Sequence, residues 1–79
     1  MSNGLTESID QLHTTEMGQE RIRRNLGLAD GDAVEWCRLH ILDKSAVIER
    51  RGKNWYVRIA GCVITVNASR YTIITAHRD

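Results

Sequence analysis

The spacing of apolar residues changes partway along the chain, from a helical period to a period of two. Up to Lys44 the apolar residues recur every three or four positions, which is typical of helices with one buried face. Beyond Lys44 they alternate with polar residues, which is typical of half-buried strands. The pattern therefore predicts an α+β fold in one domain over residues 1–79, with a helical part over 1–45 and a sheet over 46–77.

Three helices are expected in the first part. The first is short and carries its apolar residues over 5–12. The second begins at about Glu16, after two threonines whose hydroxyls can cap it, and ends before Gly27, because glycine suits the position after a helix. The third begins after Asp32 in a sequence that resembles a capping box. We expect this third helix to be the main one packed on the sheet.

Four strands are expected in the second part, separated by three short turns. The predicted strands are 46–50, 55–59, 62–66 and 71–76. Consecutive strands joined by tight turns form an antiparallel meander. The N-terminal helices are expected to pack on one face of this four-stranded antiparallel sheet, while the other face meets water.

Alternation along the strands groups their side chains into two faces. In the second strand Tyr56 and Arg58 lie opposite the apolar residues, and in the fourth strand Tyr71, Thr75 and His77 share one face. Alternation alone does not say which face is covered by helices. We predict that these five residues gather on the open face.

The formal net charge of +1 conceals an uneven distribution. Residues 1–49 hold nine acidic and five basic side chains, whereas residues 50–79 hold six basic and one acidic. A basic half indicates a surface that meets an anion, and nucleic acid is the usual one. The alternative is a charged sheet edge that prevents association between sheets.

Other classes of protein find little support in the sequence. No apolar run approaches the roughly 20 residues that cross a bilayer, and the N-terminus lacks the basic and apolar regions of a signal peptide. We therefore expect a cytoplasmic protein with no membrane partner. Cys37 and Cys62 stand among apolar residues without the spacing of a metal site, so we expect two buried thiols, no metal and no cofactor.

Four stretches of the chain look familiar together: LHTTEMGQERIRRNLGL, EWCRLHI, GKNWYVRI and ITVNASRYTIITAH. They resemble a small bacterial family known only as domain of unknown function 3781, over roughly Leu5 to His77. No activity is established for that family. Helices followed by a four-stranded sheet, with a last strand that ends in Thr75 and His77, are also similar to the compact RNase toxins of the barnase, EndoU, colicin tRNase and RelE group. This second resemblance implies a metal-free endoribonuclease.

Such an enzyme needs a general base, a general acid and cations that hold the phosphate while the ribose 2′-OH attacks it. Histidine suits proton transfer near neutral pH, and we expect His77, supported by Thr75, and His13 to carry it. Trp55 with Tyr56 or Tyr71 could stack on unpaired bases, and packing against the third helix is the alternative for Trp55. The candidate phosphate-binding cations are Arg21, Arg24, Arg51, Lys53, Arg58 and Arg70.

Three functions remain open at this point. The first is a toxin-like endoribonuclease that acts on RNA, for which a cognate protein inhibitor is an expected partner. The second is a non-catalytic module that uses the same basic sheet to bind nucleic acid or a protein, as in a phage or mobile-element accessory protein. The third is a homo-oligomer joined through an edge strand. Geometry separates the first two, because catalysis requires His77 or His13 to meet a hydroxyl and a cation in one concavity.

Overall fold

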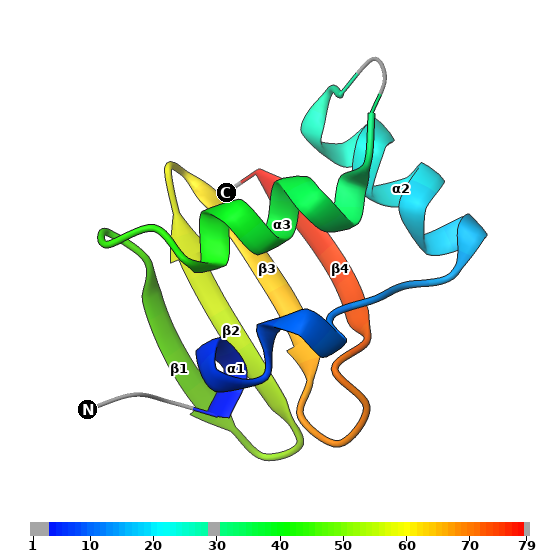
Figure 1. Cartoon of the computed structure of the whole chain (residues 1–79). Coiled ribbons are helices and arrows are strands. Elements are labelled where there is room, and N and C mark those ends of the chain that lie inside the picture. The colour runs from blue at the N-terminus through cyan, green and yellow to red at the C-terminus, as the bar shows by residue number, and fades with distance from the viewer. Residues whose placement is uncertain (1–3, 29–30, 79) are drawn as a thin grey trace.

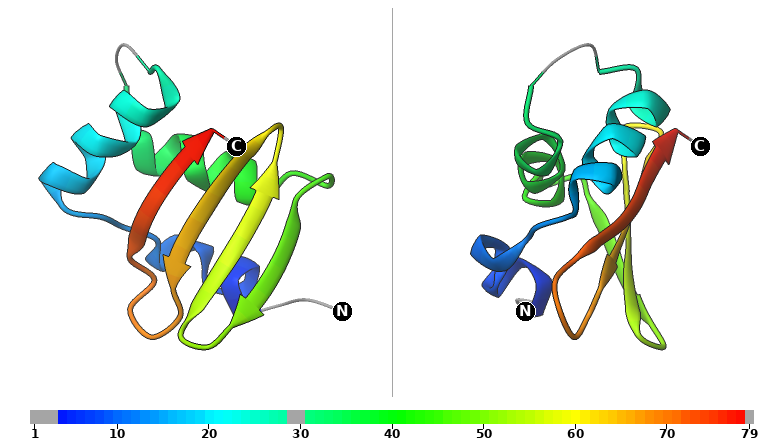
Figure 2. Two further views of the ribbon diagram at one scale, coloured as in Figure 1. Left: turned by 180° about the vertical axis from the view of Figure 1, so that it is seen from behind. Right: turned by 90° about the vertical axis from the view of Figure 1, so that its right-hand side faces the viewer.

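The structure, a computed structural model, describes residues 4–28 and 31–78. Its helices lie on one face of a four-stranded antiparallel sheet (Figures 1 and 2), so the predicted α+β class is confirmed. The elements in chain order are α1 (Gly4–Glu7), a 3-10 turn η1 (Ile9–Gln11), α2 (Glu16–Leu26), α3 (Ala33–Ile41), β1 (Val47–Arg51), β2 (Asn54–Ile59), β3 (Cys62–Asn67) and β4 (Ile73–Arg78).

The caps of α2 confirm its predicted ends. The Thr15 hydroxyl accepts a hydrogen bond from the Gly18 N–H at 3.0 Å, and Gly27 has a left-handed backbone with φ of 70°. The single helix expected over residues 5–12 is wrong, because α1 stops at Glu7 and a 3-10 turn follows. The expected helix would have only about two turns, and so few backbone hydrogen bonds cannot outweigh the free-energy cost of starting a helix. The packing of this segment on the core therefore decides its conformation.

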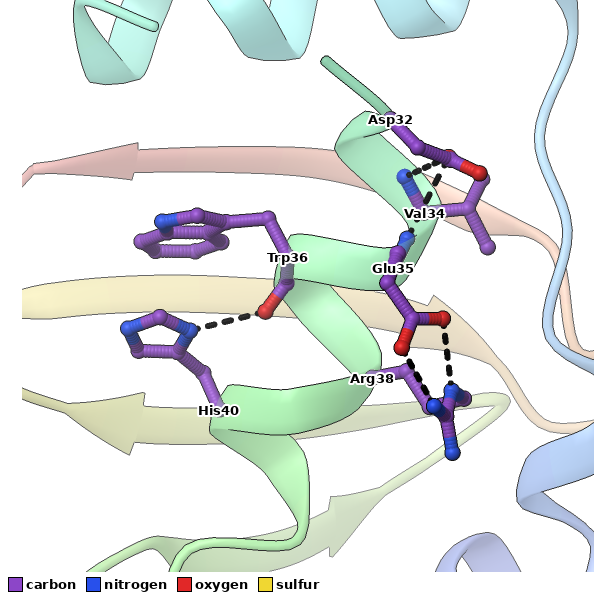
Figure 3. Close-up of polar contacts among 6 residues, drawn as sticks. All are labelled: Asp32, Val34, Glu35, Trp36, Arg38 and His40. Carbon is purple, nitrogen blue, oxygen red and sulfur yellow. Dashed lines mark hydrogen bonds and ion pairs between the residues drawn. The ribbon is translucent and has the colours of Figure 1, made fainter.

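The predicted start of α3 is also confirmed. The Asp32 carboxylate accepts hydrogen bonds from the N–H groups of Val34 and Glu35 at 2.9 and 3.3 Å (Figure 3). Glu35 then forms an ion pair with Arg38 one turn later, and this hydrogen-bonded partner lowers the pKa of the Glu35 carboxyl. These local contacts fix the helix that lies across the sheet in Figure 1.

The core lies between the helices and the covered face of the sheet. Trp55 is only 6% exposed, so it packs in the core and is not free to stack on a base. Both cysteines are buried free thiols, as expected. The helical segments contribute chiefly Leu5, Leu12, Ile22, Leu26, Cys37 and Ile41, and the sheet contributes Trp55, Val57, Ile59, Cys62, Ile64, Val66, Ile73 and Ala76.

The strands follow one another in the predicted meander order, with a register shift between β3 and β4. Thr65 is opposite Thr75, but the next residue of β3, Val66, is opposite Ile73, which leaves Ile74 without a partner. This bulge interrupts the alternation of β4. Regular alternation over 71–76 would place Ile73 on the same face as Thr75, but the bulge leaves Ile73 buried on the covered face.

The two edges of the sheet differ. The backbone of His13 pairs with β4: its N–H donates to the Tyr71 carbonyl at 3.1 Å, and its carbonyl accepts from the Ile73 N–H at 2.8 Å. Further along β4, the Asn25 side chain of α2 donates to the Ala76 carbonyl at 3.4 Å. Within the described residues, the outer edge of β1 has no such neighbouring strand.

Candidate nucleic-acid interface

The sheet has an open face that no helix crosses, seen in the left view of Figure 2. The strand register assigns its side chains, because they alternate with the buried ones. We call this set the open face. It consists of Val47, Glu49 and Arg51 on β1, Asn54, Tyr56 and Arg58 on β2, Val63, Thr65 and Asn67 on β3, and Thr75 and His77 on β4.

One row across the open face carries an arginine and a histidine. Arg58 is opposite Val63, and Val63 is opposite His77. Neighbouring strands are about 4.8 Å apart, so the backbones of Arg58 and His77 lie about 10 Å apart with a valine between them. Both side chains are exposed. They can therefore hold one anion over Val63 between them.

The next row carries the aromatic ring of the open face. Tyr56 lies between Glu49 of β1 and Thr65 of β3, and Thr75 follows on β4. Thr65 is only 8% exposed, although no helix covers it, because its neighbours in the sheet enclose it. Tyr56 itself is half-buried. The row thus places one planar ring beside the hydroxyl-bearing residues Thr65 and Thr75.

The third row leads to the two hairpins that end the sheet on one side. The Ala68 N–H donates to the Lys53 carbonyl at 2.8 Å, so the β1–β2 and β3–β4 turns touch. The Asn67 carboxamide accepts from the N–H groups of Ser69 and Arg70, each at 2.9 Å, and holds the second turn. The cations Arg51, Lys53 and Arg70 therefore gather at one end, and we call them the hairpin cluster.

One carboxylate belongs to this region and was not considered in the sequence analysis. Glu49 is on the open face beside Tyr56 and forms an ion pair with Arg51 at 3.3 Å. Alternation of side chains along the predicted strand 46–50 is the sequence signal that could have placed Glu49 on this face. Both partners are more than half exposed, so solvent screens the pair and it contributes little to stability. Its effect is to offset one positive charge of the hairpin cluster.

Tyr71 does not lie on the open face, so that prediction is wrong. Its backbone has a φ of 57°, which is uncommon for a residue with a side chain. This conformation turns the ring to the covered side, where its centroid lies 5.4 Å from that of Trp55. Alternation was extended through residue 71, but β4 begins only at Ile73.

The two histidines proposed for proton transfer do not meet. His13 lies at the edge of β4 beside Thr72, with its Nε2 atom 3.1 Å from the Thr72 hydroxyl and its Nδ1 atom 2.9 Å from the Gln11 carbonyl. His77 lies on the open face, five positions after Thr72 along the strand. At about 3.3 Å per residue, roughly 16 Å of strand separates the two positions.

The arginines of α2 divide into two kinds. Arg23 is used in the fold, since its guanidinium donates to the Gly31 carbonyl at 2.8 Å and to the Gln19 side chain at 3.2 Å. Arg21 and Arg24 are exposed, and neither side chain has a hydrogen bond or ion pair with any residue that the structure describes. Arg21 and Arg24 were predicted to bind phosphate, and both side chains are accessible to an anion.

The remaining reactive side chains lie apart from the open face. Burial raises the pKa of the Cys37 thiol to about 12, so this group stays protonated. His40 stacks on Trp36 with ring centroids 3.7 Å apart (Figure 3), and its Nδ1 atom lies 2.7 Å from the Trp36 carbonyl. In the described part of the chain, no group of histidine, cysteine and carboxylate side chains could hold a metal ion, and no pocket is present.

The fold and its open face define a small α+β protein with one basic, partly aromatic sheet surface. The chain belongs to the family described as protein of unknown function (DUF3781), which matches residues 6–77. No curated protein and no solved structure matches the chain, so the likeness to RNase toxins stays a prediction. None of the helices described is long and apolar enough to cross a membrane.

Proposed function

We propose that this protein binds single-stranded RNA on the open face of its sheet, without cleaving it. The observation that carries the proposal is the position of Tyr56. Its ring stands on an uncovered sheet face, with the cations of the hairpin cluster on one side and Arg58 beside the His77 imidazole on the other. Single-stranded RNA is recognised by aromatic rings that stack on bases and by cations that follow the backbone.

The spacing along the strand supports this assignment. Tyr56 is two residues from Arg58 on the same face, a distance of about 7 Å. A base stacked on the tyrosine thus leaves its neighbouring phosphates within reach of the flanking arginine and of the hairpin cluster. Binding alone requires this basic and aromatic surface, whereas cleavage requires two proton-transferring groups at one phosphate. His13 and His77 are too far apart to supply them.

Stacking is tested with two substitutions at Tyr56. Tyr56→Phe keeps the ring, and we expect it to bind a fluorescently labelled single-stranded RNA as the wild type does. Tyr56→Leu keeps apolar bulk without a ring, and we expect its Kd to rise by about 5- to 150-fold, which corresponds to the roughly 1–3 kcal/mol that stacking contributes per base. Fluorescence anisotropy measures both. Equal affinities for the two variants would exclude stacking on Tyr56.

The same titrations test the electrostatic part of the proposal. Each phosphate contacted on single-stranded nucleic acid adds about 0.7 to the slope of log K against log salt concentration. We expect binding to weaken steadily with salt, and Arg58→Gln to reduce the slope by about 0.7. A wild-type protein that binds no RNA at low salt would disprove the proposed function.

A further inference from the structure

We infer that the RNA-binding surface continues past the edge of β4 onto α2, where Arg21 binds a phosphate. This inference rests on the proposed function of the open face. It begins with the orientation of α2, whose surface is divided by its contacts. Ile22 and Leu26 are buried against the core. On one flank, the Gln19 side chain accepts from the Ala33 N–H at 3.2 Å, and so faces the start of α3.

The opposite flank of α2 faces the edge of the sheet. There Asn25 donates to the Ala76 carbonyl of β4. Near the end of α2, the Arg78 guanidinium donates to the Leu26 carbonyl at 2.8 Å, so the helix and the strand are tied together at this point. Residues four apart on a helix lie on the same flank. Arg21 therefore lies one turn before Asn25 on the flank that follows β4.

This flank adjoins the open face rather than the covered one. The left view of Figure 2 looks onto the open face, and α2 is visible beside the outer edge of β4 while α3 lies behind the sheet. His77 is an exposed open-face residue of β4 whose ring can donate a hydrogen bond to a phosphate. A path of hydrogen-bond donors thus leads from Arg58 through His77 to Arg21, across the edge of the sheet.

Arg21 is the member of the α2 arginines that suits this role. Arg23 is engaged by Gly31 and Gln19. Arg24 lies four residues after Glu20, whose carboxylate therefore shares its stripe of the helix and offsets its charge. Arg21 is exposed, and no described residue pairs with it. An extended backbone that crosses the edge of β4 toward α2 comes within reach of this long side chain, one turn before Asn25.

The test compares two lengths of single-stranded RNA, about 4 and about 12 nucleotides, within the range of site sizes known for single-strand-binding folds. The short RNA occupies the open face alone, and the long RNA also reaches α2. We expect Arg21→Glu to weaken binding of the long RNA by on the order of tenfold and to lower its salt slope by about 0.7, while binding of the short RNA changes less than about twofold. Arg21→Gln is expected to show a smaller loss of the same kind.

Lys44→Glu is the matched control, because it makes the same change of charge at an exposed position in the loop between α3 and β1. Thermal melts followed by circular dichroism should coincide for both variants and the wild type. The inference is overturned if Arg21→Glu and Lys44→Glu weaken the long RNA equally, or if Arg21→Glu weakens both RNAs equally. Failure of the wild type to bind even the short RNA would instead disprove the proposed function, and the extension with it.

Discussion

At the scale of single residues, burial decides which side chains keep their chemistry. Cys37 is fully buried on α3, and this burial raises the pKa of its thiol from an ordinary value of 9.0 to about 12. The thiolate is the nucleophilic form of cysteine. We therefore expect iodoacetamide to leave Cys37 unmodified in the folded protein at pH 8 and to modify it in urea. Peptide mass spectrometry gives the result, and rapid modification without urea would contradict it.

The raised pKa of Cys37 also makes the free energy of unfolding depend on pH. The folded protein holds the thiol proton more tightly than the unfolded chain does, so this group stabilises the fold fully below about pH 9. Its contribution is lost as the pH rises toward about 12. Over this interval we expect the free energy of unfolding to fall more steeply for the wild type than for Cys37→Ala. Parallel curves from urea denaturation would show that the thiol is not responsible.

At the scale of elements, local signals placed most boundaries correctly. The capping residues of α2 and α3 and the turn glycines act within a few positions of sequence, so the chain alone revealed them. The bulge in β4 depends on how β3 and β4 pair, so it could not be predicted from the local sequence pattern. Tyr71 was predicted on the open face by extending the alternation through residue 71. That prediction failed because the bulge and the positive φ of Tyr71 change which side the ring faces. The contact between Lys53 and Ala68 likewise needed the folded sheet.

The cap of α3 gives an element-scale prediction. Asp32 satisfies two N–H groups at the start of this helix, and its charge suits the helix dipole. We expect Asp32→Ala to lower the free energy of unfolding by about 1 kcal/mol, while Asp32→Asn, which caps comparably, loses a few tenths at most. Urea denaturation followed by circular dichroism measures both. A loss of the same size in both variants would mean that the hydrogen bonds of the cap contribute nothing.

At the scale of the whole molecule, the fold uses its two sheet faces and its two edges differently. Helices cover one face, and the edge of β4 is closed by α2 and the His13 segment. Arg58 and the hairpin cluster lie on or beside the open face, whereas Arg50 lies over the buried Trp55 and Arg78 donates to the Leu26 carbonyl of α2. The acidic residues are concentrated in the helical part. Part of the basic half of the sequence therefore reaches the open side of the molecule, where Glu49 offsets one of its charges.

This arrangement separates binding from catalysis. His77 lies on the open face in the row of Arg58, whereas His13 is held by Thr72 and the Gln11 carbonyl at the edge of β4. We expect His77→Ala to weaken RNA binding severalfold and His13→Ala to leave it unchanged, with the RNA intact on denaturing gels in every case. The Thr72→Val variant, which removes the partner of His13, serves as the control for effects on the fold. Cleavage of RNA by the wild type that is lost in both histidine variants would establish the endoribonuclease instead, because paired acid–base groups contribute about 10²–10⁴-fold each to the rate.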